Sequence, residues 1–200
     1  QLWPERERKR WPMELGVRLD PFDVLVVDDL AAEALSDGAA REIVARVRQG
    51  AGVLFMGGYR SFDAGGYGRS PLAPVLPFEL SNKARVWDAP IDRELHILGD
   101  VPLRPTRPHP ITTLAPEPDN TRVWSMLPPL QGMNRFGELS RNPGVQVLLE
   151  GPQREPALVT GEFGKGRVLA FAGDGTWRWY LAGQSKAHRQ FWRQAVLWLV

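Results

Sequence analysis

Residues 22–29 read FDVLVVDD, and residues 50–58 read GAGVLFMGG. The first stretch is a short, β-branched apolar run that ends in two acids, which is typical of a strand buried on both faces of a parallel sheet. Between the two stretches, apolar residues at helical spacing predict a helix that Ser36 or Asp37 caps and Gly50 ends. A strand, a helix and a second strand in this order predict a βαβ unit with a right-handed crossover.

The rest of the chain extends this unit into a single α/β domain over residues 1–200. Short apolar runs predict three further strands, at residues 145–149, 157–160 and 168–172. A glycine-rich hairpin turn is expected at 162–167, and an amphipathic final helix begins near Ser185. Residues 77–143 are rich in proline, so we expect an irregular insertion with a few short strands there.

The composition excludes several classes of function. The chain contains no cysteine, which excludes disulfides, thiolate metal sites and cysteine nucleophiles. The net charge is only +2, and the dense basic run lies at residues 6–10, so we predict no nucleic-acid partner. No apolar run reaches the ~18 residues that span a bilayer. The glycine-rich loop at 57–70 matches neither nucleotide-binding pattern, and we predict no cofactor and no metal.

Several short motifs are spread along the chain: GAGVLFMGG at 50–58, GGY at 65–67, SPL at 70–72, HPIT at 109–112, LPPL at 127–130, GKGRV at 164–168, DGTWRW at 174–179 and FWRQ at 191–194. Together they resemble the glutamine amidotransferase-like domains of bacteria, a family of uncharacterised proteins. The resemblance implies a three-layer class I glutamine amidotransferase-like, or flavodoxin-like, fold with a mixed, mostly parallel sheet. The related domains begin with an extra strand and helix; here the segment before residue 20 does not supply that strand, and residues 3–11 are expected to be what remains of the helix.

The resemblance also indicates where the catalytic residues of a glutamine amidotransferase would stand. Such an enzyme needs a thiolate at a sharp strand-to-helix turn, a histidine base and an orienting carboxylate. The thiol would stand in the turn that Gly57, Gly58 and Tyr59 occupy. The histidine would follow a late strand, where residues 173–177 read GDGTW. The sequence therefore predicts a pseudoenzyme with no catalytic residues and no glutaminase activity.

A ligand-binding crevice is expected where these two turns meet, because open α/β sheets bind ligands beyond the carboxyl ends of their strands. This expectation requires Met56 and Ala172 to finish adjacent parallel strands. The candidate lining residues belong to the strand ends and the turns after them: Asp28, Gly57, Gly58, Tyr59, Ser61, Asp174, Trp177 and Arg178.

The acids at the strand ends allow an alternative. In a hydrolase of another class, Asp28 and Asp174 would act together with His109, with or without a metal ion. A structural interpretation of the same region is also open. In that interpretation Asp28 and Asp29 cap the following helix or bind loop amides, and Asp174 pairs with Arg178.

The aromatic residues allow a second alternative, a carbohydrate-binding domain in which Trp177 and Tyr59 stack on a sugar. Trp179 and Trp192 are instead expected to fill the space between the sheet and the final helix. The other two histidines, His96 and His188, are expected at the surface or on a helix face.

The leading hypothesis is a non-catalytic binding or interaction module. The apolar C-terminus, Trp198-Leu199-Val200, favours a segment of a larger bacterial protein. The expected partners are other domains of that protein, or a small-molecule or sugar ligand. The expected compartment is the bacterial cytoplasm or the cell envelope.

Overall fold

The computed structural model describes residues 15–16, 18–81, 83 and 90–200. Within them, six strands form one sheet in the order β1-β2-β8-β7-β6-β4, and β3 and β5 form a separate two-stranded sheet. The strands are β1 Val24–Asp28, β2 Gly52–Met56, β3 His96–Val101, β4 Arg104–Pro105, β5 Leu130–Asn134, β6 Gln146–Glu150, β7 Pro156–Phe163 and β8 Gly166–Phe171. The α-helices are α2 Asp37–Gln49, α3 Asp119–Met126, α4 Trp177–Leu181 and α5 Ser185–Leu199. The basic run at 6–10 and the helix expected at 3–11 lie outside the described residues.

The βαβ unit predicted from the N-terminal third is present. β1 pairs in parallel with β2, and Val24 lies opposite Gly52. Between them, α2 begins after Ser36, whose Oγ accepts a hydrogen bond from the Ala39 N–H at 3.0 Å. The helix ends at Gly50, whose backbone φ of 132° is rarely adopted by residues that carry a side chain. The predicted cap and the predicted stop of the helix are therefore both confirmed. Each depends on local chemistry, which the sequence itself contains.

The main sheet is mixed, and the α/β fold class is confirmed. β1, β2 and β8 are parallel neighbours, whereas β7, β6 and β4 continue the sheet by antiparallel pairing. β7 and β8 form the hairpin expected around Gly164, where φ is 63°. The parallel half of the sheet presents its carboxyl ends at one edge.

The proline-rich segment contains a helix that the sequence interpretation did not predict. α3 is short, and its buried residues are Asn120 and Trp124, so no apolar period marks it. The indole N–H of Trp124 donates to the Thr112 carbonyl oxygen at 2.8 Å. The Asn120 side chain accepts the Leu114 N–H at 2.8 Å. These hydrogen bonds and the packing of Trp124 in the apolar core therefore hold the helix in place.

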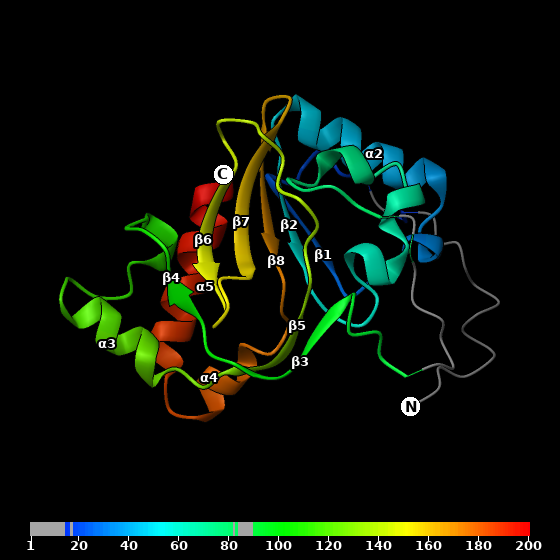
Figure 1. The fold of residues 1–200 in the computed structure, drawn as a ribbon. Coiled ribbons are helices and arrows are strands. Elements are labelled where there is room, and N and C mark those ends of the chain that lie inside the picture. Colours follow the sequence, from blue (N-terminus) through cyan, green and yellow to red (C-terminus); the bar gives the residue numbers. More distant parts are fainter. Residues whose placement is uncertain (1–14, 17, 82, 84–89) are drawn as a thin grey trace.

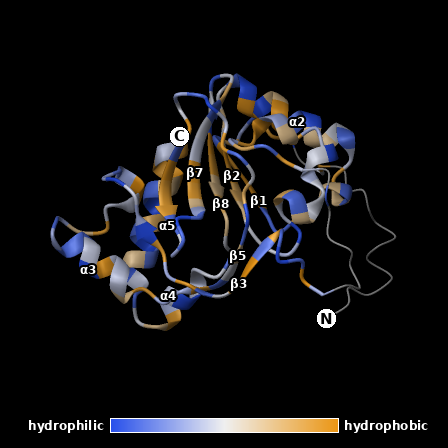
Figure 2. Ribbon diagram, in the orientation of Figure 1, coloured by the Kyte–Doolittle hydropathy of each residue, from blue (hydrophilic) through white to orange (hydrophobic). Residues whose placement is uncertain are grey.

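The elements form three layers around the sheet (Figure 1). α2 and the loops after β2 cover one face, and α5 covers the other. The apolar strands lie between these layers, and the outward sides of the helices are more hydrophilic (Figure 2). Each face has its own apolar core. One core centres on Phe171 and Phe191, and the other on Phe55 and Ile43.

The two glycine-bearing turns share one edge of the sheet. β2 and β8 run in parallel with Met56 opposite Phe171, so the chain leaves both strands at neighbouring points. The Asn134 N–H at the end of β5 donates to the Ala172 carbonyl oxygen at 2.8 Å. The predicted adjacency is confirmed, and the small β3–β5 sheet is attached to this same edge.

Candidate functional site

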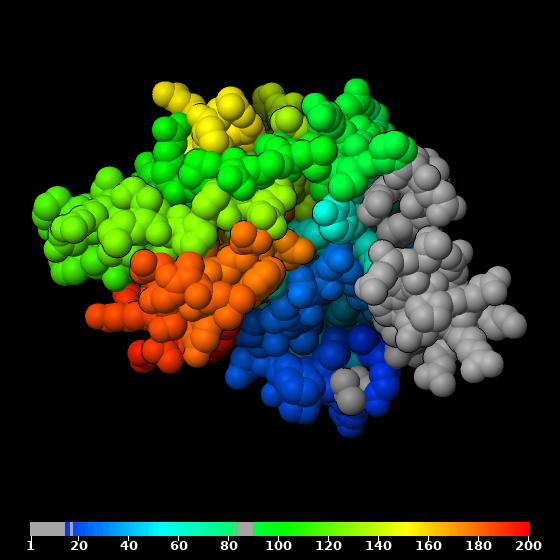
Figure 3. Space-filling view, turned by 90° about the horizontal axis from the view of Figure 1, so that it is seen from below, coloured from blue at the N-terminus to red at the C-terminus, as the bar shows by residue number. Residues whose placement is uncertain are grey.

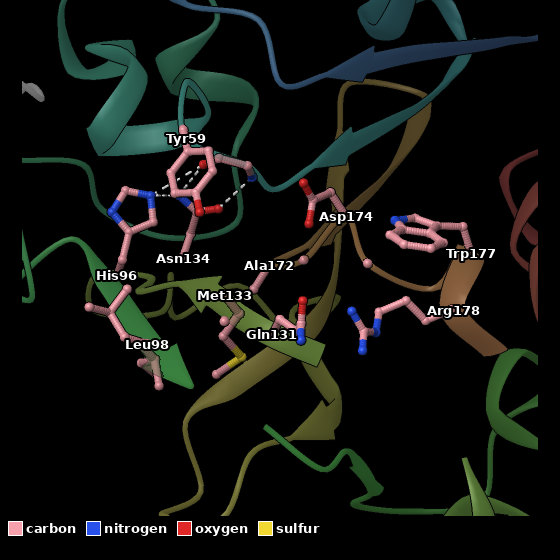
Figure 4. A pocket seen from close by; sticks show the side chains of 15 residues that line it. Tyr59, His96, Leu98, Gln131, Met133, Asn134, Ala172, Asp174, Trp177 and Arg178 are labelled. Carbon is pink, nitrogen blue, oxygen red and sulfur yellow. Dashed lines mark hydrogen bonds between the residues drawn. The ribbon is translucent and has the colours of Figure 1, made fainter. Parts of the chain in front are cut away.

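A pocket of about 250 Å³ opens at this edge. Its wall comes from residues 58–59 after β2, 96–98 of β3, 131–134 of β5, and 172–175 and 177–178 after β8 (Figure 4). Figure 3 views the molecule from this side, and the orange segment after β8 lies beside the yellow-green residues of β5. The pocket thus joins the strand-end turns to the proline-rich insertion.

The turn after β2 is packed too closely to carry a nucleophilic side chain at its two glycines. A Cβ on Gly57 would lie 2.0 Å from the carbonyl oxygen of Ala172. At Gly58 a Cβ would lie 2.3 Å from Oδ1 of Asp29, and the φ of 148° is itself unfavourable for a side chain. A backbone carbonyl therefore blocks a side chain at Gly57, and the Asp29 side chain together with the positive φ blocks one at Gly58.

Asn134 holds the floor of the pocket in place by hydrogen bonding to both the backbone N–H and the backbone carbonyl of Gly58. Its Oδ1 accepts the Gly58 N–H at 2.8 Å, and its Nδ2 donates to the Gly58 carbonyl oxygen at 3.0 Å. Nε2 of His96 lies 3.3 Å from the same oxygen. His96 is 5% exposed, so the prediction of a surface histidine is wrong. It lies inside because β3 pairs with β5 and sets His96 opposite Asn134.

The segment after β8 is anchored from within and presents side chains outward. The Trp179 N–H donates to the Pro128 carbonyl oxygen at 2.9 Å, and the Trp192 N–H donates to the Thr176 hydroxyl at 3.0 Å. Trp179 is 1% exposed, and the partly buried Trp192 packs against Phe171 of β8, so both indoles fill the space between sheet and helix as expected. Trp177, by contrast, is 55% exposed, and the Arg178 guanidinium lies 5.7 Å from its ring centroid.

Two carboxylates, Asp28 and Asp29, lie close enough to the pocket-lining Asp174 for its charge to act on their pKa values. Loss of hydration raises the pKa of Asp28, and the nearby Asp174 charge raises it further. Loss of hydration also raises the pKa of Asp29, against the lowering effect of its hydrogen bond from the Arg60 N–H at 2.6 Å. Asp29 thus binds a loop amide, as the structural interpretation expected. The expected Asp174–Arg178 ion pair is not among those formed by the described residues.

The hydrolase arrangement is wrong because His109 is at the other end of the sheet. Its Nδ1 accepts the Ile111 N–H at 3.2 Å, and its ring centroid lies 6.0 Å from that of Trp198. The neighbouring Leu199 packs on Gly52, at the start of β2. In addition, no group of three His, Asp or Glu residues in the described part of the chain is arranged to hold a metal ion.

Five of the eight predicted site residues line the pocket: Gly58, Tyr59, Asp174, Trp177 and Arg178. The other three do not. Gly57 is buried, and Asp28 is exposed at the end of β1, outside the pocket lining. Ser61 is 1% exposed and its hydroxyl has no hydrogen-bond partner among the described residues, so it faces the interior.

Sequence reasoning missed the wall contributed by β3 and β5. Leu98, Gln131 and Met133 line the pocket, as do His96 and Asn134. No motif marks these positions, because they reach the site only through the long-range pairing of two short strands. The two-residue spacing of Gln131 and Met133, typical of one face of a strand, was the available signal.

The fold and the empty nucleophile position define a class I glutamine amidotransferase-like α/β domain without the catalytic thiol. A family model described as "Putative glutamine amidotransferase" matches residues 8–200. The chain therefore belongs to this family. No curated protein matches the chain in a sequence search.

Solved structures share the fold. A cytoplasmic protein from Salmonella typhimurium LT2 superposes with a TM-score of 0.69 at 23% identity, over 90% of this chain and 72% of that one. A second cytoplasmic Salmonella typhimurium protein gives a TM-score of 0.69 at 20% identity, over 90% and 73%. A cold-adapted β-galactosidase from Rahnella sp. R3 gives 0.55 at 13% identity, and the match covers 92% of this chain but 24% of the enzyme. These likenesses establish the fold alone.

Proposed function

We propose that this chain is a non-catalytic binding module that holds a small ligand in the pocket at the strand ends. The observation that carries the proposal is the packing of Gly57 and Gly58. A glutaminase needs a nucleophile in this turn, but a backbone carbonyl fills the space for a Cβ at Gly57 and a carboxylate fills it at Gly58, and the third residue, Tyr59, carries a phenol in place of a thiol. Binding needs only the concave wall, which the fold retains.

One further observation supports a module within a larger polypeptide. The same fold occupies about a quarter of the Rahnella β-galactosidase chain, so it occurs as one part of a longer polypeptide.

The two Salmonella proteins are described as cytoplasmic, which favours the cytoplasm over the cell envelope for this chain as well. None of the described helices combines the length and hydrophobicity needed to cross a bilayer.

The proposal is tested by two measurements on the same protein. A glutaminase assay should detect no glutamate release from wild-type protein, nor from Gly58→Cys, because a side chain at this position has no room to stand. Thermal-shift screening with sugars, nucleotides and divalent ions should identify a stabilising ligand. A ligand at about 100 times its Kd adds roughly 2.7 kcal/mol to the free energy of unfolding.

Variants of the wall then locate the ligand. Tyr59→Ala and Arg178→Ala should each weaken binding of any stabilising compound, since both side chains line the pocket. Glutamine hydrolysis by the wild-type chain would overturn the non-catalytic assignment. Normal binding by both variants would place the ligand somewhere other than the pocket.

A further inference from the structure

Two aromatic side chains on the pocket wall keep about half of their surface exposed. Tyr59 is 50% exposed and Trp177 is 55% exposed. Burying an indole is strongly favourable, and Trp179, two residues further along α4, is 1% exposed. Because Trp179 anchors α4, the core does not require Trp177. In the view of Figure 4, Tyr59 and Trp177 lie on opposite sides of the pocket, with Asp174 between them.

Three planar polar groups complete this wall: the carboxylate of Asp174, the amide of Gln131 and the guanidinium of Arg178. A carboxylate offers paired acceptors, an amide offers one acceptor and two donors, and a guanidinium offers a fork of donors. Hydroxyl groups on neighbouring ring carbons both donate and accept. They can therefore engage each of these three groups through pairs of hydrogen bonds.

Charge and size restrict the ligand further. The field of Asp174 reaches Asp28 and Asp29, so a phosphate or sulfate would meet a negative edge. A free amine would be attracted by Asp174 but repelled by Arg178, so the wall is uniformly complementary to neither sign of charge. The pocket, at about 250 Å³, is smaller than the roughly 300–1,000 Å³ typical of drug-sized ligands. An uncharged ligand of one ring meets both conditions.

We propose that the pocket binds an uncharged sugar ring, stacked on Trp177 and enclosed on the opposite side by Tyr59. Asp174, Gln131 and Arg178 bind its hydroxyl groups. This inference rests on the proposed binding function and specifies its ligand class. The ring is a monosaccharide or the terminal unit of an oligosaccharide, which continues out of the open mouth of the pocket.

The test uses methyl glycosides of glucose, galactose and mannose as probes, with binding followed by saturation-transfer NMR and indole fluorescence. At least one glycoside should bind saturably to wild-type protein. Trp177→Ala should lower its affinity at least about fivefold, because the sugar ring loses the aromatic face on which it stacks, and stacking of a planar ring on an aromatic side chain contributes at least that factor. Gln131→Ala should also weaken it. Tyr180→Ala is the matched control: Tyr180 lies on the same helix with 50% exposure but does not line the pocket.

Charged probes separate this inference from the proposed function. Inorganic phosphate, tetramethylammonium and a nucleoside monophosphate are titrated in parallel. If one of them binds in a Trp177-dependent manner and the glycosides do not, the sugar assignment is overturned while the binding function stands. If no probe binds at tens of millimolar, both are overturned. Equal glycoside binding by wild type and Trp177→Ala would also overturn the sugar assignment.

Discussion

Removing the Asn134 side chain tests whether the pocket is held together as the structure indicates. Asn134→Ala deletes two hydrogen bonds to Gly58, at 2.8 and 3.0 Å, from a residue that is 1% exposed. A hydrogen bond lost with a buried partner left unsatisfied lowers the free energy of unfolding by about 1–3 kcal/mol. Gly58 is only half-buried and water can replace part of the loss, so we expect a total of about 2–4 kcal/mol.

Urea unfolding measures this change, and the thermal midpoint should fall by roughly 2–4 °C for each kcal/mol. Asn120→Ala is the matched control. Asn120 is also buried and also binds loop N–H groups, at 2.8 and 3.4 Å, but it lies outside the pocket. Both variants should be less stable, whereas only Asn134→Ala should lose pocket binding and gain hydrogen exchange at Gly58. A stability change below about 0.5 kcal/mol for Asn134→Ala would refute the reasoning.

Three further predictions follow from individual contacts. Gly57→Ala should lower the free energy of unfolding by about 3 kcal/mol or more, because its Cβ meets a carbonyl oxygen at 2.0 Å; Gly175→Ala, with its nearest neighbour at 3.8 Å, should change little in the same urea titration. The raised pKa of Asp28 means that its charge destabilises the fold at neutral pH. Asp28→Asn should therefore be more stable than wild type at pH 7, with the gain shrinking as the pH falls through the raised pKa of folded Asp28 and absent below 3.8, the ordinary pKa. An equal gain at all pH values would contradict this. Phe191→Ala should cost about 3–5 kcal/mol by thermal or urea unfolding, whereas Leu197→Ala, 60% exposed, should stay within about 0.5 kcal/mol.

The sequence predicts those parts of the molecule that local chemistry determines. The cap at Ser36, the stop at Gly50 and the apolar strands each carry their own signal, so the βαβ unit and the shared edge follow. The candidate residues in the two turns, such as Tyr59 and Trp177, follow from that adjacency.

The rest depends on contacts between distant segments. His96 and Asn134 are 38 positions apart and meet through the β3–β5 pairing, while Asn134 meets Gly58 across 76 positions. A proline-rich segment gives no period from which such pairing can be derived. His109 was misplaced for the same reason, since its position depends on packing against α5 rather than on its own motif.

The pocket is built from two parts of the chain: the turns after β2 and β8, and the β3–β5 sheet of the proline-rich insertion. The two parts differ in how tightly packing constrains their side chains. The turns after β2 and β8 are constrained by backbone packing, because Gly57 and Ala172 are in contact and Asn134 binds Gly58. Leu98 and Gln131, by contrast, are exposed on strands that pair mainly with each other. Substitutions at these two positions can change the pocket wall without disturbing either core. Under the proposed binding function, the insertion is therefore where ligand selectivity can vary, while the strand-end turns keep the fold and the pocket floor intact.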